Sequence, residues 1–196
     1  MTVPYPSVNE APATFRFTFD EFERMFDEGL LQRASGRVEL LDGEILEMSP
    51  QSVRHNDLAV TLTLLLSEAV QSLNAAGADL KVAAGATLRI GTASAPEPDV
   101  FVTRTRAGEK YHQASDALLV IEVSVSTRLD DLKIKRPLYA GAGIPEFWIV
   151  EPEVKQVRIY RDPQADGTWR LETVVIEGTI SPLFADTVCI KLADLF

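Results

Sequence analysis

The stretch that decides the fold runs from Asp116 to Val150 and reads DALLVIEVSVSTRLDDLKIKRPLYAGAGIPEFWIV. It opens with an apolar run of strand length that contains Glu122. Such a run predicts a β-strand that is covered on both faces of its sheet. A buried carboxylate needs a compensating partner. The candidates are a metal ion, a lysine, or a bulge at the strand end that lets Glu122 reach water, and we consider the first two together.

A helix is predicted to follow this strand over residues 129–139 and to end near Gly141 and Gly143. Lys133 and Lys135 are two positions apart, so at 3.6 residues per turn only one of them can face the strand. Of the residues three and four positions away, three of four are apolar around Lys135, whereas two of four are charged around Lys133. Lys135 is therefore predicted to be the inward lysine.

The chain has 196 residues, of which 46% are hydrophobic. This size predicts one domain with one well-buried core, over residues 15–196, after a flexible proline-containing lead-in at residues 1–14. No apolar stretch is expected to span a membrane, and the N-terminus lacks the pattern of a secretion signal. A cytoplasmic location is therefore expected.

The net charge of −10 counts against a tight, general DNA binder, because phosphate binding needs local positive charge. A site in which a divalent cation neutralises carboxylates remains open. The single cysteine, Cys189, cannot form an internal disulfide, and with only two histidines a Cys/His zinc site is not expected. Cys189 lies in an alternating apolar segment, and we predict that it fills the core.

The N-terminal half predicts a packing helix, a hairpin and a long helix. Thr18 and Glu21 have the spacing of a capping box, and residues 37–48, RVELLDGEILEM, predict a hairpin around an Asp-Gly turn. The glutamates of this hairpin alternate with apolar residues, so a solvated face is the simplest explanation for each. A leucine stripe predicts a long amphipathic helix after residue 56. His55, near its start, is more typical of a cap or a surface residue than of a catalyst.

Asp99 follows Pro96-Glu97-Pro98 and precedes the apolar residues 100–102, so it is predicted at the mouth of a strand. A turn-closing aspartate is the alternative interpretation. Residues 103–115 form a polar connection whose basic side chains are expected near the candidate site; they are Arg104, Arg106 and Lys110.

Residues 146–150, 155–160 and 169–176 predict successive antiparallel strands, and residues 179–196 predict a short terminal strand. The predicted fold class is α+β, with a mixed β-sheet flanked by helices and with N-terminal and C-terminal β-hairpins.

Asp99, Glu122 and Lys135 form the candidate catalytic set. Two carboxylates that lie together repel each other or recruit a hard cation such as Mg²⁺, for which the carbonyl of Val123 is a further candidate ligand. Such an ion makes a bound water more acidic and polarises a phosphoryl oxygen. Lys135 would orient that water or stabilise the developing charge. The spacing alone fits many unrelated pairs of strands.

Three segments together carry a resemblance to a known family. PEPDV at 96–100, VIEVSVST at 120–127 and KRPLYAGAGIPEFWIVEP at 135–152 resemble the Uma-two family of restriction endonucleases, a branch of the PD-(D/E)XK nuclease superfamily. The hairpin RVELLDGEILEMSP and His55 also fit this family, so the resemblance covers roughly residues 15–196.

The resemblance implies a restriction-endonuclease-like core and hydrolysis of DNA phosphodiester bonds with Mg²⁺ or Mn²⁺, by in-line attack of a metal-activated water. By position, Asp99 is the PD aspartate and Glu122 is the acidic residue of the E-X-K element. Ser124 stands where the lysine of this element is expected. The resemblance implies that Lys135, in the next helix, takes the role of that lysine. Glu39 matches a family glutamate that helps to complete the metal shell.

One departure is Val125, where many relatives have an acidic residue, so that an extra acidic contact is not expected.

The leading hypothesis is a Mg²⁺-dependent DNA endonuclease, with Glu39 as an auxiliary residue and a homodimer as the expected assembly. The second is a catalytically silent nuclease-fold interaction module that acts as a homodimer. A two-carboxylate glycosidase ranks last, because no aromatic sugar platform is evident. DNA versus RNA and any recognition sequence stay open.

Overall fold

A computed structural model describes residues 14–32, 34, 36–125 and 129–196. The predicted lead-in, residues 1–14, therefore lies outside the described residues except for residue 14. The α-helices are α1 (Phe19–Asp27), α2 (Val53–Ala75) and α3 (Leu129–Gly141). The strands are β1 (Val38–Leu41), β2 (Glu44–Glu47), β3 (Leu80–Ala84), β4 (Leu88–Arg89), β5 (Val100–Arg104), β6 (His112–Gln113), β7 (Ala117–Val123), β8 (Glu146–Glu151), β9 (Gln156–Pro163), β10 (Trp169–Val175), β11 (Thr179–Ile180) and β12 (Ile190–Lys191).

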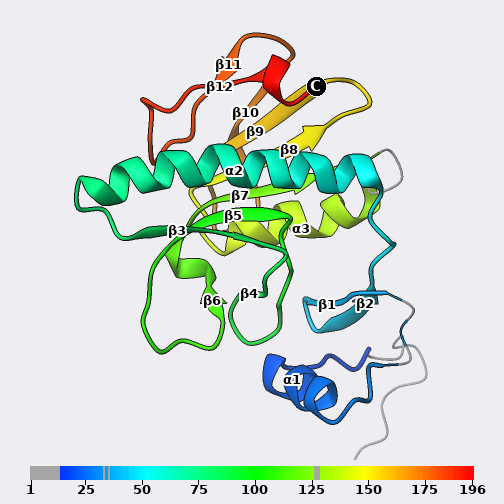
Figure 1. The fold of residues 1–196 in the computed structure, drawn as a ribbon. Coiled ribbons are helices and arrows are strands. Elements are labelled where there is room, and N and C mark those ends of the chain that lie inside the picture. Colours follow the sequence, from blue (N-terminus) through cyan, green and yellow to red (C-terminus); the bar gives the residue numbers. More distant parts are fainter. Residues whose placement is uncertain (1–13, 33, 35, 126–128) are drawn as a thin grey trace, which may run out of the picture.

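The main sheet has six strands in the order β10-β9-β8-β7-β5-β3 (Figure 1). Within the described residues, its only parallel pair is β7 with β8, which α3 connects, and the other neighbours are antiparallel. This is the mixed sheet that was predicted, and β7 lies in its interior. The long apolar run of β7 is explained by this position, because neighbouring strands and both covering layers exclude water from it.

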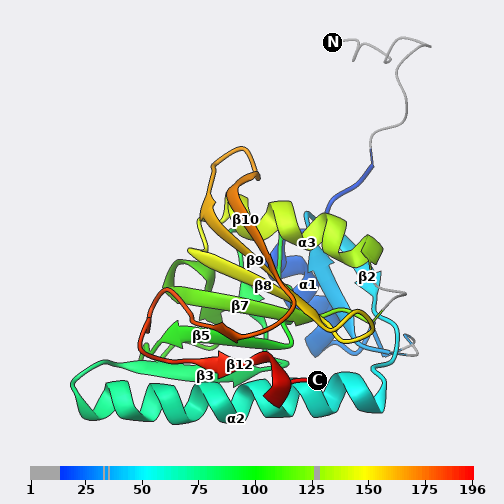
Figure 2. The same cartoon turned by 90° about the horizontal axis from the view of Figure 1, so that it is seen from above.

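Helices cover the two faces of this sheet (Figure 2). On one face, the leucine stripe of α2 packs against inward residues of β5 and β7, among them Val102 and Ile121. On the other face, Leu132 and Tyr139 of α3 pack against Val120 and Phe147. Alternation along the strands assigns the odd and even positions of β7 to opposite layers. Glu122 consequently lies on the α3 face.

By length and composition alone, α2 is the one helix of the described part that could cross a membrane, contrary to the expectation from the sequence. Its stripe of Leu58, Leu62 and Leu66 is buried against the sheet. Helix α2 therefore packs as a core helix packs in a folded domain.

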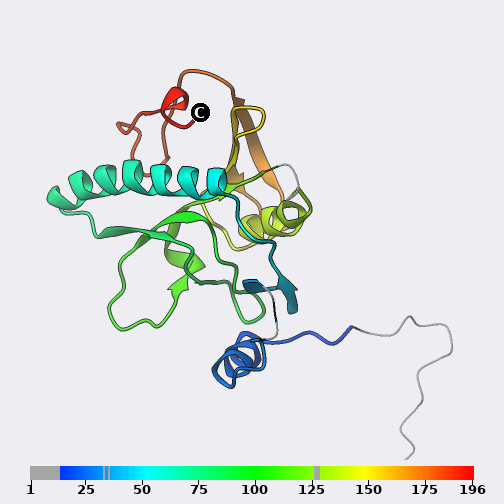
Figure 3. The same ribbon diagram turned by 45° about the vertical axis from the view of Figure 1, so that its right-hand side comes forward.

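The N-terminal hairpin forms as predicted and docks on the segment that leads to Asp99. Asp42 and Gly43 both have positive φ, as the tight turn between β1 and β2 requires. The N–H of Ala95 donates to the carbonyl of Leu40 at 2.7 Å, so β1 is bound to the polypeptide just before Asp99. Figure 3 shows β1 and β2 beside this part of the chain, with α1 beyond them. The capping box of Thr18 and Glu21 starts α1.

The C-terminal hairpin is also present, as β11 paired with β12. The prediction that Cys189 fills the core is wrong, since its side chain is exposed. Ile190 and Leu192 are buried and Val188 is half-buried. The physical reason is that Cys189 is out of phase with these three inward residues in an extended segment, so its side chain points to the opposite side.

Candidate functional site

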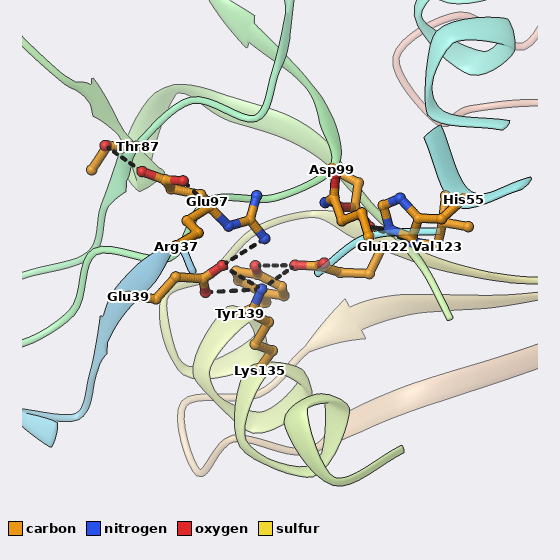
Figure 4. Close-up of polar contacts among 11 residues, drawn as sticks. Arg37, Glu39, His55, Thr87, Glu97, Asp99, Glu122, Val123, Lys135 and Tyr139 are labelled. Carbon is orange, nitrogen blue, oxygen red and sulfur yellow. Dashed lines mark hydrogen bonds and ion pairs between the residues drawn. The ribbon is translucent and has the colours of Figure 1, made fainter. Parts of the chain in front are cut away.

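The candidate site lies where the chain enters β5 and where β7 ends. Because β5 and β7 are antiparallel, with Val100 opposite Ile121, Asp99 and Glu122 come to the same end of the sheet. The hairpin β1–β2 brings Glu39 to this end, and α3 brings Lys135 (Figure 4). All four of these side chains are buried. The structure thus gathers four residues that are distant in sequence.

Lys135 connects the two sides of this cluster. Its Nζ lies 2.9 Å from Oε2 of Glu39 and 3.1 Å from Oε1 of Glu122. The prediction of an inward Lys135 is confirmed, since its side chain is 2% exposed whereas Lys133 is exposed. Of the three partners considered for the buried charge of Glu122, the structure shows the lysine, which forms an ion pair with it.

Tyr139 is a site residue that the sequence analysis missed. Its hydroxyl donates to Oε1 of Glu122 at 2.7 Å, and the whole side chain is buried. The signal was available, because Tyr139 follows Lys135 by four positions and so projects from the same face of α3. Together they give Oε1 of Glu122 two donors from one helix.

Glu39 is fully buried, so the explanation of a solvated hairpin face is wrong for this residue. The side of β1 that carries Glu39 docks against the rest of the domain. Glu39 is therefore buried, although the alternation of polar and apolar residues in β1 suggested an exposed position. Besides Lys135, its carboxylate forms an ion pair with Arg37, whose guanidinium is 3.1 Å from Oε1. Arg37 also lies 3.4 Å from Glu97, so it bridges two carboxylates. Glu39 therefore lies between two cations.

The carboxylate of Asp99 has three hydrogen-bond partners among the described residues. Its Oδ2 lies 2.9 Å from Nε2 of His55 and accepts from the backbone N–H of Val123 at 2.7 Å. Its Oδ1 accepts from the amide of Gln51 at 3.0 Å. The bond to Val123 places the carboxylate of Asp99 beside the peptide that follows Glu122. Asp99 is thus more than a turn-closing residue.

His55 is buried, and the expectation that it is a cap or surface residue is wrong. Ser52 caps α2, and its hydroxyl accepts from the N–H of His55, which frees the imidazole for Asp99. The first turn of α2 faces inward at this point because the helix starts over the end of β5. Periodicity within α2 does not reveal this contact.

The ionisation of the two acids differs because their partners differ. Burial raises the pKa of Glu122 to about 7; the charge of Lys135 opposes this rise, and the charges of Asp99 and Glu39 add to it. Burial also acts to raise the pKa of Asp99, but the hydrogen bond and charge of His55 and the N–H of Val123 outweigh it. The pKa of Asp99 is therefore below its usual value.

The neighbouring carboxylates stabilise the positive charge of Lys135. Burial acts to lower the pKa of Lys135, but the charges of Glu122 and Glu39 prevail and raise it above its usual value. Lys135 is therefore an ammonium ion at neutral pH.

The basic cluster that was expected near the site lies away from it. Arg104 ends β5, whereas Asp99 precedes its first residue, so about 17 Å of extended chain separates them. Arg106 forms an ion pair with the buried Asp116, and Lys110 forms one with Glu23. The cluster follows Asp99 closely in sequence, but a strand carries the chain away from the site.

The donor set suits a hard divalent cation. The part of the chain that the structure describes has no group of three His, Cys, Asp or Glu side chains arranged to hold a metal ion. Mg²⁺ keeps several waters and needs only one or two protein carboxylates. Asp99 and Glu122 could supply these, and Oε2 of Glu122 accepts no hydrogen bond from the described residues. Val123 contacts Asp99 through its backbone N–H. That the carbonyl of Val123 binds a metal ion stays a prediction.

Comparison with known proteins gives a family match and similar solved structures. Residues 19–188 match the model of the Uma2 family, described as "Putative restriction endonuclease". The fold is similar to a crystal structure from Anabaena variabilis ATCC 29413, described as "a putative nuclease belonging to DUF820". The TM-score is 0.72 and the sequence identity is 17%, over 92% of this chain and 97% of that chain. No curated protein matches the sequence.

Proposed function

Because the chain belongs to the Uma2 family of restriction endonucleases, we propose that it is a divalent-metal-dependent endonuclease that hydrolyses the phosphodiester bonds of DNA. The observation that carries the proposal is the ammonium group of Lys135, which is buried between the carboxylates of Glu39 and Glu122. A second carboxylate, Asp99, is bound to the residue that follows Glu122. Buried acids beside a buried cation, at one end of a sheet, are typical of a catalytic centre.

Asp99 and Glu122 would hold the cation, with the carbonyl of Val123 as a further ligand. When it is bound, such an ion polarises a phosphoryl oxygen and increases the acidity of water. Tyr139 and Lys135 both donate to Oε1 of Glu122, whereas Oε2 accepts no hydrogen bond from the described residues and would face the ion. His55, Gln51 and Val123 hold the carboxylate of Asp99 in one orientation.

Lys135 would act as a fixed positive hydrogen-bond donor. Since its pKa is raised above its usual value, it retains its proton and does not serve as a general base. It would donate to the attacking water and stabilise the negative charge that develops on the phosphoryl group. Glu39, itself held by Arg37, orients the ammonium group from the opposite side. This is the auxiliary role we propose for Glu39.

The test is nicking of supercoiled plasmid by purified protein in Mg²⁺ or Mn²⁺, with a labelled RNA of the same sequence as a second substrate. Glu122→Gln and Lys135→Met should each lose at least about a hundredfold in rate. The matched controls are Asp116→Asn, a buried acid just before β7 at the other end of the sheet, and Lys191→Met, an exposed lysine of β12. Nicking that persists in Glu122→Gln would overturn the proposal.

A further inference from the structure

A groove of about 370 Å³ lies on the α3 face of the sheet, between α3 and strands β8, β9 and β10. We call it the α3 groove. It includes three cations from two elements, Lys133 and Arg136 of α3 and Arg158 of β9, together with the ring of Tyr160. Figure 2 shows α3 above this part of the sheet. Nothing in the site described above uses these side chains.

The α3 groove begins next to the candidate site. Ile149, which lines it, is the direct neighbour of Glu122 in the pairing of β7 with β8, and adjacent strands are about 4.8 Å apart. Helix α3 belongs to both places, since Lys135 projects into the site while Lys133 and Arg136 are exposed beside it. A strand of nucleic acid whose phosphate reached Glu122 would meet these cations next.

Two of the cations are held in place by the protein. The guanidinium of Arg136 lies 5.7 Å from the centre of the Tyr160 ring. Arg158 donates from Nε to Glu151 at 2.7 Å and lies 3.4 Å from Glu172. Ordered cations lose little conformational freedom when they bind a ligand. Glu151 and Glu172 neutralise part of the charge of Arg158, and Lys133 and Arg136 are the exposed cations of the lining.

We propose that the α3 groove binds the sugar–phosphate backbone of the nucleic acid next to the scissile phosphate. This inference rests on the proposed function. With a net charge of −10, the chain can attract phosphates only through a local excess of cations. The α3 groove supplies one beside the site, whereas the cluster around Arg104 lies at the other end of β5.

The experiment measures binding of a fluorescein-labelled 20-base-pair DNA duplex by anisotropy, with EDTA or Ca²⁺ present so that cleavage does not interfere. The double variant Lys133→Gln/Arg136→Gln should bind about tenfold more weakly at 0.1 M KCl. The slope of log Kd against log salt concentration should fall by about 2, because each of the two cations neutralises one phosphate in the unsubstituted protein. A urea unfolding curve checks that the fold is intact.

The matched control is Lys81→Gln/Arg104→Gln, which removes the same net charge from the other basic cluster. It should leave the salt dependence of binding unchanged. Equal weakening in both double variants, or no binding by the unsubstituted protein, would overturn the inference.

The nicking assay separates this inference from the proposed function. If Glu122→Gln nicks plasmid at the normal rate while Lys133→Gln/Arg136→Gln loses binding, the assignment of the catalytic centre fails and the groove stands. If the plasmid is nicked as proposed and the groove variant binds normally, the groove alone fails.

Discussion

Nε2 of His55 lies 2.9 Å from Oδ2 of Asp99, and both side chains are buried. This contact joins the first turn of α2 to the entrance of β5, 44 residues apart in sequence. It also determines the orientation of a carboxylate that we propose as a metal ligand. Its energetic contribution can be measured without any assumption about catalysis.

We expect His55 and Asp99 to be strongly coupled in a double-mutant cycle with His55→Ala and Asp99→Ala. A buried hydrogen bond to a charged group contributes about 1.5–3 kcal/mol, and we expect a coupling energy in this range from urea unfolding. The control cycle uses Arg89 and Asp20, an exposed pair 3.4 Å apart, for which about 0.5 kcal/mol or less is expected. Equal coupling in the two cycles would show that the contact has no special role.

Lys135→Met should destabilise the protein far more than Lys133→Met. Removing Lys135 leaves two buried carboxylates without their shared cation, which costs about 3–5 kcal/mol. The exposed Lys133 should change the free energy of unfolding by about 0.5 kcal/mol or less. The loss in Lys135→Met should shrink at pH 5, where Glu122 is protonated. A loss that does not change with pH argues against the ion pair.

Tyr139→Phe should cost about 1–2 kcal/mol of stability, because the fully buried Glu122 loses a donor at 2.7 Å. The control is Tyr160→Phe, whose hydroxyl contacts Glu172 at 3.2 Å in a partly exposed place. We expect about 0.5 kcal/mol or less for that change. Chemical unfolding of both variants at pH 7 gives the comparison, and a ranking in the opposite order contradicts it.

Without metal, the contribution of Glu122 to stability should fall as pH rises. Burial, partly opposed by Lys135, raises its folded-state pKa to about 7 from an ordinary value of 4.5, so the folded state holds this proton more tightly than the unfolded state. The contribution is therefore complete below pH 4.5 and is lost by about pH 7.

The slope is at most about 1.4 kcal/mol per pH unit in this window. Unfolding in EDTA at pH 5, 6, 7 and 8 tests it, with Glu122→Gln as the variant that lacks this titration. The free energy difference between Glu122→Gln and the unsubstituted protein should shift in favour of the variant as pH rises. A constant difference would show that Glu122 does not titrate in this range.

Divalent metal should stabilise the folded protein, and EDTA should remove the effect. At a Mn²⁺ concentration one hundred times the Kd, the gain is about 2.7 kcal/mol, seen as a rise in Tm. Asp99→Asn and Glu122→Gln should abolish the gain, whereas Asp116→Asn, a buried acid with its own arginine, should keep it. A gain that survives in Glu122→Gln places the ion elsewhere.

The inward directions of Glu122 and Lys135 followed from local periodicity. The apolar run around Glu122 indicated an interior strand, and the apolar neighbours of Lys135 indicated which lysine faces inward. Both were confirmed, since strand alternation and the helical repeat depend only on nearby residues. The same reasoning failed for Cys189, where the apolar neighbours were used but their phase was not.

The sequence by itself thus determined the main strands and helices, the hairpin turn and the inward lysine of α3. Only the tertiary structure decided which inward residues meet, because contacts between distant segments depend on strand order and on how the hairpin docks. It brought Glu39 from β1 to Lys135 of α3, brought His55 to Asp99 and carried Arg104 away from both. Such contacts form between elements packed against each other, and no repeat within a single element encodes them.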